Sequence, residues 1–481
     1  MSSKEKAIHE QEIVETNDRV DTLNLEIDPK DERKFLIKMD FRLMPLFCMM
    51  FFFSYLTRSN LGNAKIAGLM EDLNLTDSQF STASSVLYST YITAQIPGVL
   101  LMKKFKARAN WYLGLMMICF SLVTLFAVFL DNFGGLITHR VLIGLFEGSF
   151  FSCMSVYISD CYFPHELGKR FAYLFSASAI SSSFGGLIGT GITKIEGGPL
   201  AKWRYLYLIE GLLNFVAALV VIWKLPPDAS TIFKTEKEQE IFRIRDIKRK
   251  HFMGNEEFSF RNVLQSFKSV KTYTSIVIQF CQDICMYGFT TFLSSILKLG
   301  LGFDSLQAQY LTIPVYVLAG IILIIAAALA DKWRIRGPLI VFLNLFSIAG
   351  YSVILGCKND ALKYFGCFLI TVSLFSNVSL NESWLAVNSA PADRRAASIG
   401  ANQTFGNAAG IIAPLVYRAA PYTLGHAFSL GCMVVAALVA LGQHFMFKRI
   451  NAKRLSLLDT AEDEEIEIAK GDLSVTYKFI T

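Results

Sequence analysis

Apolar segments long enough to cross a lipid bilayer recur along this chain of 481 residues. A bilayer core of about 30 Å requires roughly 20 apolar residues in a helix. The composition agrees, because 18% of the residues are charged, against about 25% in average soluble domains. We therefore expect an all-α membrane protein with twelve spans, near residues 43–66, 79–101, 111–130, 134–158, 171–193, 203–225, 272–297, 306–330, 338–356, 362–387, 398–420 and 424–447.

Polar segments divide these spans into two six-helix halves. Residues 1–40 mix acidic and polar types and are expected to form a disordered N-terminal tail. The predicted helical bundles occupy residues 41–225 and 272–447, with a polar linker at 226–271 between them and a C-terminal tail at 448–481. Lysine and arginine gather in the linker, in both tails and in alternate loops. This bias predicts that the linker and both tails are cytosolic.

Charge inside the first span is the least expected feature of the pattern. The apolar run from Leu43 to Phe53 continues without a break into Ser54–Lys65, which carries Arg58, two asparagines and Lys65. A charged side chain at bilayer depth costs at least about 2.5–3.5 kcal/mol even on lenient scales. We therefore expect Arg58 to have a function within the membrane.

Two local patterns bear on packing. Thr76, with Gln79 three residues later, predicts a capping box that begins the second membrane helix. Glycines recur inside the fifth and eleventh spans at a spacing that lets helices approach closely. They are Gly185, Gly186, Gly189 and Gly191, and Gly400, Gly406 and Gly410.

Four motifs carry a resemblance to a known family. Residues 55–64 (YLTRSNLGNA) resemble the first-helix signature of the anion:cation symporter family, in its fungal allantoate and nicotinate permease branch. Residues 140–148 (RVLIGLFEG), 203–211 (WRYLYLIEG) and 406–414 (GNAAGIIAP) resemble its fourth, sixth and eleventh helices. The likeness covers about residues 35–450 and implies the major facilitator fold, in which substrate binds near the midplane between two halves that rock around it.

The sequence departs from that family at two places. The family usually has an aspartate before the first-helix arginine, where this chain has Thr57. The cytosolic loop between the second and third helices usually carries an aspartate too, and here the loop around Lys103–Lys106 has none. The equivalent loop of the second half, Ala330–Arg336, keeps the acidic residue followed by basic ones. The first departure leaves the mode of proton coupling open.

Arg58 and Arg140 are predicted to lie at similar depth, because they enter their helices from opposite sides of the membrane. Two guanidinium groups at one level can hold a carboxylate through bidentate hydrogen bonds. Alternatively, each arginine pairs with a protein carboxylate or extends to the membrane surface. We expect a substrate clamp.

Glu147 lies seven residues after Arg140, on the same helical face and about 10 Å deeper. The resemblance implies that the matching glutamate belongs to the proton-coupling machinery, and we add Asp283, near the middle of its span, as a second proton carrier. The alternative for Glu147 is a permanent ion pair with Arg58 or Arg140. The charges of Arg58, Arg140 and Glu147 sum to about +1, which suits a monoanion.

Polar and aromatic residues of several spans complete the predicted substrate site. For each of them, interhelical hydrogen bonding or ordinary aromatic packing is the alternative. These candidates are Asn63, Tyr91, Gln279, Tyr287, Tyr316, Asn381, Trp384, Gln403 and Asn407.

Charged residues beside the cytosolic helix ends are predicted to form salt bridges that latch an inner gate when the carrier faces outward. Solvated loop charges are the alternative reading. These residues are Glu166, Arg170, Asp331, Arg334, Asp393 and Arg394.

Together these features predict a monomeric transporter that imports a small organic anion, such as nicotinate, by proton-coupled alternating access. The resemblance implies a fungal plasma membrane, with the endoplasmic reticulum and the vacuole as alternatives. The expected partners are the anion, protons and the bilayer, and we expect no cofactor, metal or nucleic acid. A nutrient receptor that has lost transport is the alternative function. An enzyme is not expected, because no catalytic triad, metal-ligand spacing or phosphate loop is visible.

Overall fold

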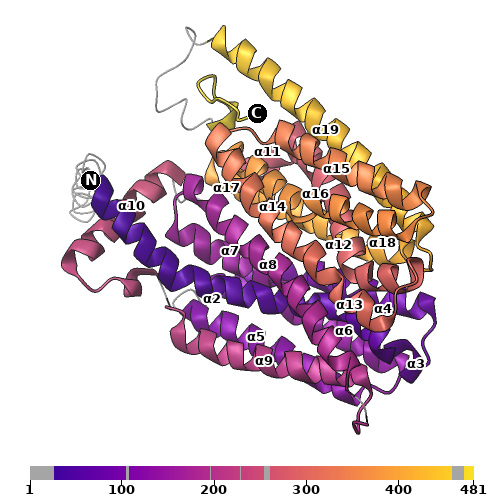
Figure 1. The fold of residues 1–481 in the computed structure, drawn as a ribbon. Coiled ribbons are helices and arrows are strands. Elements are labelled where there is room, and N and C mark those ends of the chain that lie inside the picture. The colour runs from indigo at the N-terminus through magenta and orange to yellow at the C-terminus, as the bar shows by residue number, and fades with distance from the viewer. Residues whose placement is uncertain (1–26, 105–107, 196, 228, 254–259, 458–470) are drawn as a thin grey trace, which may run out of the picture.

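The computed structural model describes residues 27–104, 108–195, 197–227, 229–253, 260–457 and 471–481. Within these ranges the secondary structure is helical, and the long helices run side by side in one bundle (Figure 1). In Figure 1 the two described chain ends lie toward the same end of the bundle, near α10 and α11, while α3 and α13 lie at the other. The loop charges predict that the first of these ends is cytosolic.

The first half runs from α2 to α9. α2 passes through a short π-helical turn (Lys65–Leu69) into α3, and α6 and α7 together make the fourth span, Phe133–Cys161. The helices are α2 (Pro29–Ala64), α3 (Met70–Asp72), α4 (Asp77–Lys104), α5 (Ala109–Phe126), α6 (Phe133–Glu147), α7 (Phe150–Cys161), α8 (Pro164–Thr193) and α9 (Lys202–Lys224).

The linker contributes α10 (Glu236–Met253) and α11 (Phe260–Ser266). The second half then runs from α12 to α19, with a π-helical turn (Ile296–Gly300) after α12. Its helices are α12 (Val270–Ser295), α13 (Ser305–Tyr310), α14 (Thr312–Trp333), α15 (Gly337–Gly356), α16 (Asp360–Val387), α17 (Ala392–Asn407), α18 (Ala409–Val416) and α19 (Thr423–Leu455).

Each of the twelve expected spans is helical. Among the described residues, nine helices are both long enough and apolar enough to cross a membrane on composition alone. The other three expected spans are α2, α4 and the α17–α18 pair, which carry more polar side chains. Polar residues are tolerated at membrane depth when they face the protein interior, so these three spans are the natural places to look for a site.

The start of the first helix differs from the prediction. α2 begins at Pro29, and the Asp28 side chain caps it by accepting a hydrogen bond from the Lys30 amide over 2.8 Å. The expectation of disorder is therefore wrong for residues 29–40, while residues 1–26 lie outside the described ranges. The linker helix α10 supports this extension, because Phe35 stacks on Phe233 with centroids 4.1 Å apart and Arg245 pairs with Glu32.

The predicted capping box is present at the start of α4. The Thr76 amide donates to Gln79 Oε1 over 2.9 Å, and the Gln79 amide donates to Thr76 Oγ1 over 3.3 Å. Two amides that the helix itself cannot satisfy are paired in this way. α4 accordingly begins at Asp77.

Glycines allow the two halves to meet at close range. A methyl group at Gly189 would lie 2.5 Å from Gln309 of α13, and one at Gly410 would lie 2.3 Å from the Tyr88 ring of α4. The prediction of close packing is also confirmed for Gly185, Gly186 and Gly406, and it is wrong for Gly191 and Gly400, which have no atom within 4 Å of an added methyl group.

Candidate functional site

An ion pair lies buried in the first half. Arg58 Nε of α2 is 2.8 Å from Glu147 Oε1, at the last residue of α6, and both side chains are almost fully buried. Ser54, one turn before Arg58, donates its hydroxyl to the same carboxylate oxygen over 2.5 Å. The structure thus contains the Arg58–Glu147 ion pair, which was one of the two roles predicted for Glu147 from the sequence.

Aromatic rings surround the Arg58 guanidinium. Its central carbon lies 5.2 Å from the Tyr55 ring centroid and 5.3 Å from that of Tyr91, within the range of cation–π attraction. Tyr88, one turn before Tyr91 on α4, places its ring centroid 4.6 Å from that of Tyr287 on α12. The predicted residues Arg58, Tyr91 and Tyr287 therefore line one region at the contact between the halves.

Arg140 has a different partner. It is buried on α6 and donates a hydrogen bond from its terminal nitrogen to the Tyr207 hydroxyl of α9 over 2.8 Å. Within the described residues no hydrogen bond or ion pair links Arg140 to Glu147 or to another carboxylate. The two arginines predicted to form a clamp thus have different partners in this conformation: Arg58 pairs with a carboxylate and Arg140 donates to a phenol.

Two further ionisable groups lie near Tyr207. Glu210 is one turn after Tyr207 on α9, and His139 packs its ring edge-on against Tyr207. Both are buried, and neither carboxylate oxygen of Glu210 nor either ring nitrogen of His139 has a hydrogen-bond partner among the described residues. A buried polar group without a partner is costly, so Glu210 becomes a candidate that the prediction omitted.

The second half presents a network of amides around Asp283 on α12. Gln279, one turn earlier, donates its amide to both carboxylate oxygens of Asp283 over 3.2–3.3 Å. The Gln279 carbonyl in turn accepts from Asn381 of α16 over 2.9 Å and from Asn402 of α17 over 3.3 Å. The predicted residues Gln279, Asp283 and Asn381 therefore join α12 to α16, as the hydrogen-bonding alternative described, and Asn402, which was not predicted, adds α17.

Other predicted substrate contacts are spread more widely. Tyr287 donates to Asn407 over 2.6 Å, and Tyr316 donates to the Thr290 carbonyl over 3.3 Å. The backbone carbonyl of Asn63 accepts from Gln309, and Gln403 is half-buried on α17. Trp384 is not brought to this region, because its indole donates to the carbonyl of Ile480 and packs on Phe447.

Four of the predicted gate residues have ion-pair partners in their own half or in the linker. Arg170 pairs with Asp40 over 2.8 Å, and Glu166 pairs with Arg245 of the linker helix over 2.7 Å. In the second half Asp331 pairs with Arg336 over 3.2 Å, and Arg394 pairs with Asp472. Arg334 is exposed and ends α14 in a left-handed conformation, and Asp393 lies in the first turn of α17. That these residues form salt bridges between the two halves when the carrier faces outward stays a prediction.

Sequence reasoning missed five residues of this site. Ser54 and Tyr55 lie one turn before Arg58, and Tyr88 lies one turn before Tyr91, so helical spacing from the predicted residues could have found them. The other two, Tyr207 and Glu210, lie inside the motif at 203–211, where only the structure shows the hydrogen bond from Arg140 to Tyr207 and the burial of Glu210.

Comparisons with known proteins assign the chain to a family. The family model of the Major Facilitator Superfamily matches residues 47–414. An uncharacterized transporter of Schizosaccharomyces pombe is 44% identical over 95% of this chain and 95% of its own length. A high-affinity nicotinic acid transporter of Saccharomyces cerevisiae is 32% identical over 90% of this chain and 81% of its own length.

Solved structures show the same fold. A proton:xylose symporter superposes with a TM-score of 0.65 at 14% identity, over 86% of this chain and 96% of the other. A bacterial homologue of the human lysosomal transporter Spinster, in an inward-facing and occupied conformation, gives a TM-score of 0.60 at 13% identity, over 83% of this chain and 95% of the other. The protein is therefore a multi-pass membrane transporter that belongs to the major facilitator superfamily.

Proposed function

We propose that the protein imports a small monocarboxylate of the nicotinate type together with a proton, most simply across a fungal plasma membrane. The observation that carries the proposal is the buried Arg58–Glu147 pair, set between the rings of Tyr55 and Tyr91. Its cation recognises a carboxylate, and the flanking rings suit a flat aromatic acid. The relative named for nicotinic acid supports the same class of substrate.

Competition for Arg58 supplies the coupling. An incoming carboxylate that binds Arg58 must displace Glu147, and the displaced carboxylate would then be a buried charge without a partner, which is costly. A proton on Glu147 removes that charge. The pair is neutral before binding, and it remains neutral when one monoanion and one proton enter together. The proposed stoichiometry is therefore one proton for each monoanion.

Arg140 is proposed as the second arm of the substrate clamp. Its present partner, the neutral Tyr207 hydroxyl, is a weaker acceptor for a guanidinium than a carboxylate is. When substrate binds, Arg140 would release the Tyr207 hydroxyl and donate to the substrate carboxylate instead. Asp283 and its amide partners are proposed to face the substrate from the second half, with Asp283 as an additional proton carrier.

The test uses purified protein in sealed vesicles with radiolabelled nicotinate and an imposed pH gradient. The wild-type chain is expected to accumulate nicotinate above its external concentration when the outside is acidic. Glu147→Gln keeps the size of the side chain and its contact with Ser54 but cannot release a proton, so it should exchange nicotinate without accumulating it.

Glu71→Gln, at an exposed carboxylate, is the matched control and should accumulate nicotinate normally. Accumulation by Glu147→Gln that equals the wild type would overturn the role of Glu147 in coupling. Absence of nicotinate exchange in the wild type would overturn the proposed substrate, and counterflow with other small carboxylates would then separate a carrier from a receptor.

A further inference from the structure

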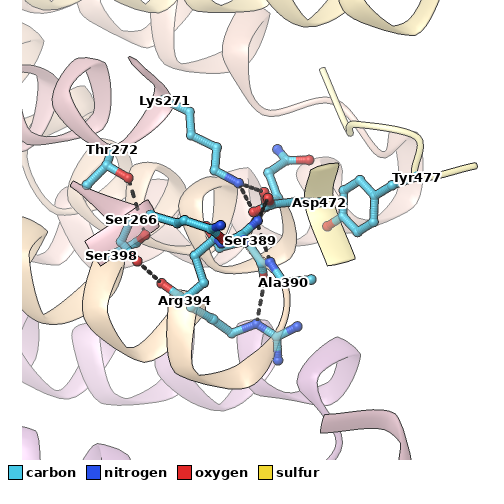
Figure 2. A network of polar contacts seen from close by, with 12 residues as sticks. Ser266, Lys271, Thr272, Ser389, Ala390, Arg394, Ser398, Asp472 and Tyr477 are labelled. Carbon is cyan, nitrogen blue, oxygen red and sulfur yellow. Dashed lines mark hydrogen bonds and ion pairs between the residues drawn. The ribbon is translucent and has the colours of Figure 1, made fainter. Parts of the chain in front are cut away.

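A short C-terminal segment, residues 471–481, lies packed against the predicted cytosolic end of the second half, and Figure 2 shows its polar contacts there. Asp472 is buried there and pairs with both Lys271, in the first turn of α12, and Arg394, in the first turn of α17. The same carboxylate accepts a hydrogen bond from the Ala390 amide over 3.1 Å, in the connection between α16 and α17. One side chain thus joins the starts of α12 and α17 to the connection between α16 and α17.

The two cations of this site are themselves buried, with Lys271 4% and Arg394 3% exposed. Among the described residues, Asp472 is the carboxylate that pairs with each of them. Removing the acidic partner of a buried cation is strongly destabilising, because the cation is then left without compensation away from water. The position of the segment is therefore coupled to the positions of both helix ends.

The rest of the segment is anchored along its length. Ile480 accepts from Trp384 Nε1 over 2.8 Å and donates its amide to the Asn388 side chain over 2.8 Å, at the end of α16. The Phe479 ring stacks on Phe447 of α19 with centroids 4.7 Å apart and planes 9° from parallel.

Backbone groups of the segment add further contacts. Arg454 of α19 donates to the carbonyls of Tyr477 and Asp472, each over 2.6 Å. The Tyr477 hydroxyl donates to the Val387 carbonyl over 2.7 Å, and the Arg336 amide, just before α15, donates to the Thr481 carbonyl over 3.0 Å. All of these partners belong to the second half, and none of the described contacts of the segment reaches the first half.

We propose that residues 471–481 are an internal brace that binds a preformed cationic site and makes the cytosolic ends of α12, α16, α17 and α19 move as one rigid unit. These helices also carry Asp283, Asn381 and Gln403, so the brace fixes the base of the helices that present them. It does not lock the halves together through its described contacts, all of which lie within one half. It therefore permits rocking between the halves and opposes bending within the second.

Hydrogen exchange of the full-length protein in lipid nanodiscs, followed by mass spectrometry, tests this brace without any substrate. Asp472→Asn removes the charge that holds both cations, and Phe479→Ala removes the stacking contact without changing charge. Both should speed exchange at the first turns of α12 and α17 about tenfold, while α5 and α9 of the first half stay protected. Leu473→Ala, beside Asp472 but 59% exposed, is the matched control and should change nothing.

A disulfide provides the rescue. Thr272 of α12 and Ser398 of α17 have hydroxyl oxygens 3.2 Å apart beside the cationic site (Figure 2). Thr272→Cys with Ser398→Cys, oxidised in the Asp472→Asn background, should restore slow exchange at both helix ends. Unchanged exchange in Asp472→Asn and Phe479→Ala, an equal increase in both halves, or failure of the oxidised disulfide to restore protection would each overturn the brace.

Discussion

Asn214 of α9 donates a hydrogen bond to the Thr57 hydroxyl of α2 over 3.1 Å. Thr57 also donates to the Phe53 carbonyl of its own helix over 3.1 Å. The neighbouring Arg58 meets Glu147 of α6 instead. An acidic side chain at position 57 would thus face α9, and its replacement by threonine leaves the Arg58–Glu147 pair intact.

Thr57→Val tests whether that position takes part in coupling. Valine keeps the shape of threonine but cannot accept from Asn214, so the variant should lose about 1 kcal/mol of stability. Its ratio of internal to external nicotinate under a pH gradient should match the wild type. A folded Thr57→Val protein that transports but no longer responds to the gradient would place coupling at α9 rather than at Glu147.

Arg58→Lys tests the geometry of recognition at constant charge. An ammonium group lacks the planar fork that binds a carboxylate through two hydrogen bonds, so nicotinate uptake should fall at least roughly 30-fold. The amount of protein in the membrane, measured on the same cells, should stay within twofold of the wild type. Lys65→Arg offers a control at the end of the same helix, and uptake by Arg58→Lys that matched this control would exclude bidentate binding.

Tyr207→Phe tests the second arm of the clamp. The variant removes the hydroxyl that accepts the hydrogen bond from Arg140 and leaves the ring in place. Arg140 is then freer to meet the substrate, so the KM for nicotinate should fall or stay constant, whereas Arg140→Ala should raise it at least tenfold. Equal KM values for Arg140→Ala and the wild type would remove Arg140 from the site.

Gly410→Ala and Gly400→Ala compare two positions in the eleventh span. An added methyl group at Gly410 meets the Tyr88 ring at 2.3 Å, whereas one at Gly400 meets no atom within 4 Å. Gly410→Ala should lower the thermal unfolding temperature and reduce transport, at a cost of about 1–3 kcal/mol for overpacking. Gly400→Ala should be neutral or slightly stabilising, because alanine favours a helix over glycine. Equal melting curves for both variants would contradict the close contact between α4 and α18.

The contact between α2 and the linker helix α10 should depend on pH. Lys38 donates to Glu238 over 2.5 Å, and this hydrogen bond lowers the pKa of Glu238 to about 2. Because this folded-state pKa lies below the ordinary value, the contact stabilises the fold above the ordinary pKa, and that contribution is lost as the pH falls toward 2. Proteolysis of the linker should therefore accelerate below about pH 4. Glu238→Gln should show a smaller acceleration over this range, because only the other carboxylates of the contact, such as Glu32 beside Arg245, are then left to be protonated. An identical pH profile in both proteins would contradict the assignment.

The sequence by itself determined the fold class and the place where a site had to be. The number and length of the apolar segments left few architectures other than two six-helix halves, because a bilayer requires every backbone polar group to be satisfied inside a helix. Arg58 stood out for the same reason, since a charge at that depth needs a partner. The capping box at Thr76 followed from local spacing alone.

Only the tertiary structure decided which partner each charged group has. Periodicity gives the face of a helix but not the helix that packs against it. It therefore could not decide whether Glu147 pairs with Arg58 or with Arg140. Nor could it assign Tyr207 as the partner of Arg140. It could not assign Trp384 to the C-terminal segment rather than to the substrate, because that contact joins residues far apart in the chain. Such contacts depend on how the side chains of different helices pack together, and the sequence of one helix does not specify its neighbours.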